Sequence, residues 1–469
     1  MTSMRRNSLL VLLLAASMVV SGCSTVSRLN PFNRGGDDGP GETAAEGERI
    51  SIVAADQKLE VAEALKGADF FLPTPATTTE WPLPGGTAEQ SNGQPEAGGS
   101  LSVAWKRNFG RGSGGGSFVT APPVSANGKI FVMDGEASVS AFDAQSGSQV
   151  WKVNLRPDSK RDKEAFGGGL AVSDGKLYVS SGYRFVAQLN ADTGAVVWRT
   201  VTEQPIHAAP TVSGGRLFVV SVDNTLLTFD AATGADGWTY QGLSESARIL
   251  AASSPAVSGD TVVASFGSGE LVALRAANGN DLWNEALSQA NRNNALSEIR
   301  DIPGRPVIYQ GDVFAVSHSG VFAATDLRTG QARWTLPVTG ITSPWPAGDV
   351  VYVVSKSGEV ICAARETGQI YWIRDLGVGR ERSSGRGFMG IGFLGGKKKY
   401  TTRPIWSSPL LASNRIVLAG TTGELVAINA KTGEVEKTMD LGAPTLIGPI
   451  AVNGTIYVVT DEAQLIALR

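Results

Sequence analysis

The chain has 469 residues, of which 42% are hydrophobic and 18% charged, so it is long and apolar enough to bury a large core. Lys and Arg together number 41 and Asp and Glu 44, and the net charge of -3 gives no electrostatic reason to expect a nucleic-acid partner. The 57 glycines follow no collagen period, and this abundance indicates many tight turns and an all-β fold.

Residues 1–22 are predicted to be a signal peptide. Arg5 and Arg6 precede an apolar run at residues 9–20. This run is shorter than the roughly 20 residues that a membrane-spanning helix needs, so it fits the apolar region of an export signal.

Cys23 is the predicted site of lipid attachment. The run Val20-Ser21-Gly22-Cys23 resembles the bacterial lipobox, which implies cleavage before Cys23 and acylation of this cysteine. Ser24, where Asp would mark inner-membrane retention, implies the periplasmic face of the outer membrane. Acyl chains would supply the anchor that the short apolar run cannot. The alternative is an ordinary signal peptide with a chance cysteine.

Two segments separate this signal from the main domain. Residues 23–48 are rich in Gly, Asp, Glu, Pro and Asn, and such chain buries too little apolar surface to order itself, so we predict a flexible tether. Residues 49–100 are predicted to be an extended N-terminal extension. Its aromatic clusters at residues 70–73 and 81–84 are expected to pin it across the main domain, and residues 88–100 are predicted to be a linker.

One unit recurs through residues 101–469. It contains a Pro, several short apolar strands, an Asp or Asn, then Ala-x-Thr-Gly, three further residues and Trp; one clear copy ends Asp230-Ala231-Ala232-Thr233-Gly234 and Trp238. Successive copies stand about 40–50 residues apart, which is the period of β-propeller blades. The Asp side chain can hydrogen-bond the turn, Gly can adopt a positive φ, and Trp is expected to wedge against the next blade while its N–H finds a carbonyl.

The two ends of this region predict how the ring closes. The last copy stops at Leu468-Arg469 without Thr-Gly or Trp, whereas residues 101–106 form a strand with Trp105 that belongs to no copy of its own. We therefore predict an eight-bladed β-propeller whose last blade is closed by the N-terminal strand, which removes an exposed sheet edge.

An insertion at about residues 379–402 breaks the period. It combines glycines, apolar residues and the basic run Lys397-Lys398-Lys399. Two interpretations stay open: a contact finger for a partner or for lipid headgroups, or an insertion with no specific role.

The repeat Ala-x-Asp-x-x-Thr-Gly-x-x-x-Trp resembles that of quinoprotein-type (PQQ-like) propellers over nearly all of residues 101–469. Within that superfamily the lipobox, the blade number and the stretch Leu287-Ser288-Gln289-Ala290 resemble the BamB family, lipoproteins of the outer-membrane β-barrel assembly (BAM) complex. The resemblance implies a non-enzymatic scaffold that binds the POTRA domains of BamA and other BAM subunits, and that aids insertion of β-barrel proteins.

The resemblance also implies two partner-contact loops. One corresponds to Arg248, Ile249 and Leu250, where the apolar and basic residues stand in a different order from the family's Leu-x-Leu-Arg motif. The other corresponds to Asp301, the first and only retained member of an Asp-x-Asp pair.

The sequence predicts no catalytic, cofactor or metal site, and no small-molecule substrate. The Gly-x-Gly-x-x-Gly runs at 110–115 and 390–395 open no helix of a βαβ unit, and His207 and His318 lack cysteine partners for a metal. Cys362 is expected to be a buried free thiol in a strand. The alternatives are a PQQ-dependent dehydrogenase-like oxidoreductase, although the adjacent cysteine pair of those enzymes is missing, and a periplasmic ligand-sensing propeller.

Overall fold

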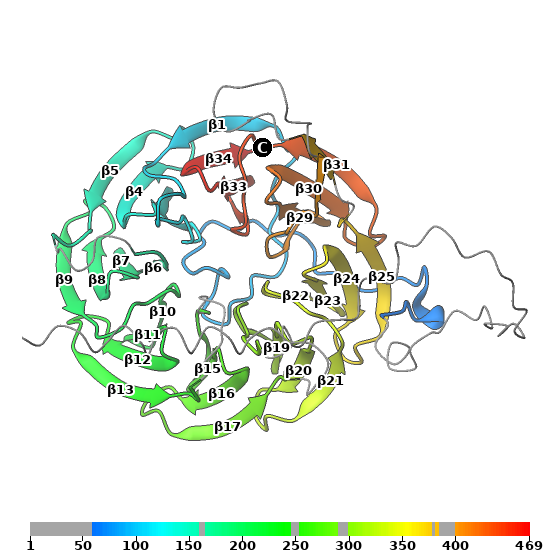
Figure 1. The fold of residues 1–469 in the computed structure, drawn as a ribbon, viewed down its shortest axis with the longest axis horizontal. Coiled ribbons are helices and arrows are strands. Elements are labelled where there is room, and N and C mark those ends of the chain that lie inside the picture. The colour runs from blue at the N-terminus through cyan, green and yellow to red at the C-terminus, as the bar shows by residue number, and fades with distance from the viewer. Residues whose placement is uncertain (1–58, 159–164, 245–252, 289–298, 378–379, 384–398) are drawn as a thin grey trace, which may run out of the picture. The chain divides into compact units, whose positions relative to one another are not determined.

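In the computed structural model, residues 57–469 form one compact unit, and the structure describes residues 59–158, 165–244, 253–288, 299–377, 380–383 and 399–469. Eight four-stranded antiparallel sheets are arranged in a ring (Figure 1), as predicted. A 3-10 helix, η1 (Glu63–Leu65), precedes them. Among the described residues, no helix has the length and apolar character needed to cross a membrane.

Each blade runs from an inner strand at the axis to an outer strand at the rim. The first four blades are β2 (Val124–Ala126), β3 (Lys129–Met133), β4 (Ser138–Asp143), β5 (Gln149–Asn154); β6 (Gly168–Ser173), β7 (Lys176–Ser181), β8 (Phe185–Asn190), β9 (Val196–Val201); β10 (Thr211–Ser213), β11 (Arg216–Val220), β12 (Thr225–Asp230), β13 (Asp236–Gln241); β14 (Ala256–Ser258), β15 (Thr261–Ser265), β16 (Glu270–Arg275), β17 (Asp281–Ala286).

The remaining blades follow the same order. They are β18 (Val307–Tyr309), β19 (Asp312–Val316), β20 (Phe322–Asp326), β21 (Ala332–Leu336); β22 (Trp345–Ala347), β23 (Val350–Val354), β24 (Glu359–Ala364), β25 (Ile370–Asp375); β28 (Leu410–Ala412), β29 (Arg415–Ala419), β30 (Glu424–Asn429), β31 (Val435–Asp440); and β32 (Ile450–Val452), β33 (Thr455–Val459), β34 (Gln464–Leu468) with β1 (Val103–Asn108). A separate hairpin, β26 (Arg380–Ser383) and β27 (Lys399–Thr402), forms the base of the insertion, and residues 384–398 lie outside the described part.

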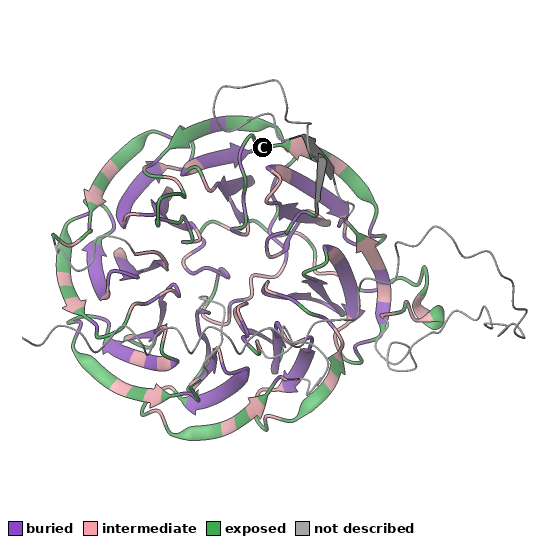
Figure 2. Cartoon of the chain, in the orientation of Figure 1, coloured by how far each residue is buried: buried purple, intermediate pink, exposed green. Residues whose placement is uncertain are grey.

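The core lies between neighbouring blades. The second and third strands of each blade are largely buried, whereas outer strands such as β9 and β13 alternate exposed and half-buried residues (Figure 2). Strands buried on both faces need continuous apolar runs, which is why the repeat carries its β-branched residues there.

The turn of the repeat has the predicted chemistry. The carboxylate of Asp230 accepts hydrogen bonds from the hydroxyl and the backbone N–H of Thr233, both at 2.8 Å. These bonds stabilise the charged form and lower the pKa of Asp230. Gly234 follows with a φ of 73°, a conformation that glycine adopts without a steric penalty.

The turn glycine also receives the tryptophan of the preceding blade. A Cβ on Gly368 would lie 2.8 Å from the Trp334 ring, and the Trp334 Nε1 donates to the Arg365 carbonyl at 2.8 Å. The same Trp-on-Gly contact recurs at Gly147, Gly194, Gly234, Gly279, Gly330 and Gly433. The predicted packing of the repeat Trp against the next blade is therefore confirmed. The predicted bond from its N–H to a carbonyl is not general, because the Trp372 Nε1 has no partner among the described residues and the Trp198 Nε1 donates to Gln188 of its own blade.

Replacing Gly368 by Ala should test this contact. We expect a loss of about 1–3 kcal/mol in the free energy of unfolding beyond the backbone strain, because the new methyl group overlaps Trp334. Gly175→Ala is the matched control, since Gly175 has the same φ of 73° and open space where its Cβ would lie. Equal losses in urea denaturation of the two variants would contradict the packing role.

The ring closes as predicted. β1 pairs antiparallel with β34, so the N-terminal strand becomes the outer strand of the last blade. Trp105 on β1 packs over Gly147 of the first blade and donates its Nε1 hydrogen to the Gln145 carbonyl at 3.2 Å.

Residues 76–98 cross the ring at the axis and bond to all eight blades (Figure 1). Trp81 exchanges two backbone hydrogen bonds with the first blade, each 2.8 Å long, and its side chain is only 1% exposed. The blade residues in these bonds are, in chain order, Ser125, Val172, Thr211, Val257, Ile308, Trp345, Ser413 and Gly454.

Residues 88–100 differ from the predicted linker. The carbonyls of Ala88 and Glu89 accept hydrogen bonds from the inner strands β14 and β18, and the side chains of Gln90 and Gln94 are buried. Inner strands have one edge without a partner in their own sheet, and polar chain laid along the axis satisfies it. No periodicity in the sequence marks such a role.

Candidate functional site

Of the five predicted site residues, the structure describes Asp301. Cys23, Arg248, Ile249 and Leu250 lie outside the described residues. Asp301 is described, and its side chain is only 1% exposed. As placed, this carboxylate is not displayed on the surface, so a partner docking here would first meet the residues around it. Direct contact by Asp301 stays a prediction.

The structure does bring the ends of the two predicted contact loops together. Ser253 directly follows the first loop, and its hydroxyl contacts that of Ser265 on β15. Ser265 also donates to the carbonyl of Ile302, the residue after Asp301, at 3.4 Å. Ser253 and Ile302, which follow the two predicted sets of contact residues along the chain, therefore both contact Ser265, just before the inner strands of the fourth and fifth blades.

His318 supports the Asp301 segment from the fifth blade. Its backbone N–H donates to the Asp301 carbonyl at 2.8 Å, and its Nε2 lies 2.9 Å from the Nζ of Lys356. Burial and the Lys356 charge together lower the pKa of His318 below its usual value. Its surroundings therefore disfavour a protonated His318 imidazole next to the predicted contact loop.

This arrangement predicts a pH dependence of stability. Because the folded-state pKa of His318 is depressed, the unfolded chain takes up the proton first, and stability should fall as the pH drops through about 6.5. His318→Gln should remove this part of the pH dependence, whereas Lys356→Met should only weaken it. Urea denaturation between about pH 8 and pH 5.5 measures the effect. An identical pH profile for wild type and His318→Gln would contradict it.

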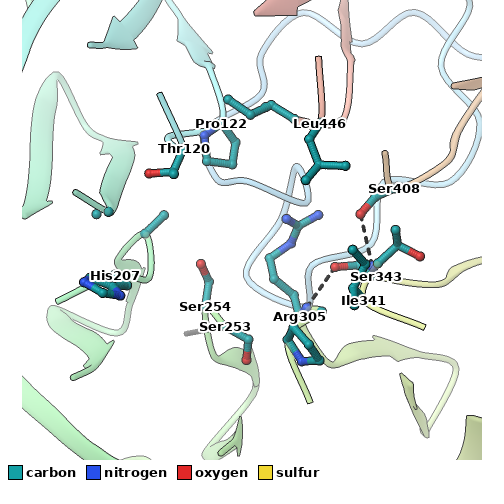
Figure 3. A pocket seen from close by; sticks show the side chains of 18 of the residues that line it. Thr120, Pro122, His207, Ser253, Ser254, Arg305, Ile341, Ser343, Ser408 and Leu446 are labelled. Atoms are coloured by element: carbon teal, nitrogen blue, oxygen red, sulfur yellow. Dashed lines mark hydrogen bonds between the residues drawn. The ribbon is translucent and has the colours of Figure 1, made fainter. Parts of the chain in front are cut away.

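A cavity of about 290 Å³ opens at the axis beside these loops (Figure 3). It is lined by residues that lie just before the inner strands, at the end of the ring remote from the turns that the extension contacts. Ser253 and Ser254 come from the fourth blade and Arg305 from the fifth. The Arg305 side chain extends into the cavity, toward Pro122 and Leu446 (Figure 3).

Sequence reasoning did not single out Arg305. Aligning the repeats could have found it. Arg305 directly precedes Pro306, at a position where three other blades have Ser before Pro: Ser254-Pro255, Ser343-Pro344 and Ser408-Pro409. An unusual residue at a repeated position becomes visible only when that position is known to face the axis.

The histidines and the cysteine that the sequence offered as candidates for a metal or reactive site lie far apart in the chain and do not form one site among the described residues. His207 stacks against Phe166 with ring centroids 4.4 Å apart in the cavity wall, whereas His318 lies in the fifth blade. Within the described ranges, no three His, Cys, Asp or Glu side chains gather as a metal site would require. Cys362 is a free, fully buried thiol, as expected, and burial raises its pKa.

Comparison with known proteins places these features in context. A family model described as outer membrane protein assembly factor BamB matches residues 102–162, 135–374 and 396–469. A protein of that name from Moranella endobia is 25% identical over 370 residues, which cover 78% of this chain and 89% of that protein. Its counterpart from Burkholderia pseudomallei is 26% identical over 333 residues, covering 67% and 84%.

Solved structures share the fold. The crystal structure of BamB from Moraxella catarrhalis has a TM-score of 0.64 at 18% identity, covering 79% of this chain and 99% of that one. A quinohemoprotein alcohol dehydrogenase from Comamonas testosteroni has a TM-score of 0.60 at 15% identity, covering 84% and 80%. At these identities the likeness shows the eight-bladed ring and no activity.

Proposed function

Since this chain belongs to the family of the outer membrane protein assembly factor BamB, we propose that it is a non-enzymatic scaffold lipoprotein of the BAM complex. In this role it binds the POTRA domains of BamA and aids the insertion of β-barrel proteins into the outer membrane. The observation that carries the proposal is the family match across the propeller, since the matching relatives are named as assembly factors.

The contact surface we propose is the end of the ring from which the loops at 245–252 and 289–298 return. The hydrogen bond from Ser265 to Ile302 ties the bases of both loops to one place. Two loops that emerge side by side from a rigid ring can present one continuous surface to a partner domain. Arg248, Ile249, Leu250 and Asp301 are the residues we propose for this contact.

The anchor we propose is acylated Cys23, which would keep the propeller at the periplasmic face of the outer membrane. Residues 23–48 would serve as the tether and residues 49–100 as an extension that reaches the axis of the ring. Acyl chains bind bilayers in proportion to the methylene groups they bury, so a lipidated cysteine can hold a protein at the membrane surface.

Co-purification of the BAM complex tests this function. We expect full-length wild-type protein in a mild detergent extract to recover BamA, and Arg248→Glu or Leu250→Asp to reduce that recovery several-fold while the ring stays folded. Arg328→Glu is the matched control, because Arg328 is exposed in the β20–β21 turn, which bonds to Gly311 at the other end of the blade. Cys23→Ala should move the protein into the soluble fraction. Failure of wild-type protein to recover BamA would contradict the proposal.

The oxidoreductase alternative has its own test. Incubation with PQQ and calcium, followed by dye reduction, would show turnover if this chain shared the activity of the dehydrogenases whose fold it resembles. Turnover would contradict a purely scaffolding role. Recovery of a different dominant partner would favour the ligand-sensing alternative.

A further inference from the structure

One residue in the lining of the axial cavity departs from the repeated pattern of the blades. In seven of the eight blades, one residue stands two positions before the first paired residue of the inner strand, and six of these residues are small or Pro: Pro122, Ala209, Ser254, Ser343, Ser408 and Gly448. The seventh is Arg305. In the second blade the pairing begins earlier along the inner strand, at Gly168. All seven residues line the cavity, so this position places one guanidinium among otherwise short side chains.

Among the described residues that line the cavity, none offers a counter-charge to the Arg305 guanidinium. Its Nε is buried without a hydrogen-bond acceptor, and none of the described residues pairs with its guanidinium. The described residues that line the cavity include no Asp or Glu. Burial alone lowers the pKa of Arg305 to about 10. Arg305 is only partly buried, so the rest of its guanidinium faces the cavity, where an anion could pair with it.

The backbone of Arg305 is held by its neighbours. Its N–H donates to the Ser343 hydroxyl at 2.8 Å, and the Ser343 N–H donates to the Ser408 hydroxyl at 3.0 Å (Figure 3). Arg305 is therefore positioned by the sixth blade, which is itself linked to the seventh. The fixed backbone places the start of the Arg305 side chain at the cavity, so only the side chain itself has to be ordered when a ligand binds.

The rest of the cavity has mixed chemistry. Phe166, Ile341 and Leu446 give it apolar surface, and hydroxyl groups come from residues such as Thr120 and Ser254. A volume of about 290 Å³ is near the lower end of the range for small-molecule pockets, roughly 300 Å³. One cation and an apolar wall suit a singly charged organic anion better than a phosphate, which usually takes several donors.

We propose that the axial cavity is a binding site for a small organic carboxylate, with the carboxylate on the Arg305 guanidinium and the organic part against Phe166, Ile341 and Leu446. The planar guanidinium fork matches a carboxylate with two parallel hydrogen bonds. The carboxylate could belong to a free small molecule or to the C-terminus of a peptide. Binding of a small carboxylate at this site can be measured without a protein partner or a membrane, so its test needs only the isolated protein.

Calorimetric titration of the detergent-solubilised full-length protein with benzoate tests the site. Benzamide, the neutral molecule of the same shape, should bind at least tenfold more weakly. Arg305→Met should weaken benzoate binding at least tenfold, Arg305→Lys should weaken it less, and Arg328→Met, the exposed control, should leave it unchanged. Equal binding of benzoate and benzamide, or unchanged binding in Arg305→Met, would overturn the proposal.

A second variant keeps Arg305 in place. Leu446 is 40% exposed and extends into the cavity, so Leu446→Glu should fold and should place a competing carboxylate near the guanidinium (Figure 3). We expect this variant to bind benzoate at least tenfold more weakly than the wild-type protein does. An unchanged affinity would count against the site.

Binding of short peptides distinguishes a free carboxylate from the C-terminus of a peptide. Trialanine acetylated at its N-terminus is compared with its C-terminal amide. Stronger binding of the acid than of the amide assigns the site to a chain end, and binding of benzoate alone assigns it to a free anion. If neither benzoate nor the peptide acid binds at millimolar concentration, the proposal fails.

Discussion

Trp81→Ala is expected to lower the free energy of unfolding by about 3–5 kcal/mol, the range for removing a large buried aromatic side chain. Trp81 is 1% exposed, and its ring lies 6.2 Å from that of Trp345 in the sixth blade. Its Nε1 donates to the Pro84 carbonyl at 3.3 Å, so the variant also leaves a buried acceptor without a partner. The side chain thus fastens the extension to the axis of the ring.

Phe71→Ala is the control for this prediction. Phe71 lies in the same extension, but its side chain is 63% exposed, so its removal should change stability by no more than about 0.5 kcal/mol. Urea denaturation followed by circular dichroism measures both variants. If Trp81→Ala were as stable as Phe71→Ala, the extension would not be part of the folding unit.

Ile466→Asp is expected to destabilise the ring by at least about 3–5 kcal/mol, since it buries a charge without compensation. Ile466 is fully buried in β34, between Val458 of β33 and Lys106 of β1. This strand joins the two ends of the propeller, so its loss opens the last blade and exposes sheet edges that favour aggregation.

Val103→Asp is the matched control for closure. Val103 lies in β1 of the same sheet, but its side chain is 44% exposed, so the same substitution should be tolerated. Size-exclusion chromatography and thermal unfolding compare the two variants. A monomeric, cooperatively unfolding Ile466→Asp protein would contradict the closing role of β34.

The sequence predicted the fold well because the repeat is a local pattern copied many times. Asp230, Thr233 and Gly234 form a turn through contacts within five residues, so their spacing alone indicates the hairpin. Closure by β1 was predictable too, since a strand with Trp105 and a last copy without a Trp strand complete each other.

The candidate sites were less predictable because they depend on where distant segments meet. Asp301 looks like a polar loop residue in the sequence, yet the adjacent blades bury it. Residues 88–100 have the composition of a linker, and only the unpaired edges of the inner strands explain why they are ordered along the axis.

The sequence by itself determined the blade, the number of copies and the strand that closes the ring, because hydrogen bonds and apolar periodicity within each unit specify them. Only the tertiary structure decided what lies at the axis. There one position from each of seven blades converges, and the described residues that line the cavity with Arg305 include no carboxylate. Convergence of residues so far apart in the chain follows from the closed circle, and no local pattern records it.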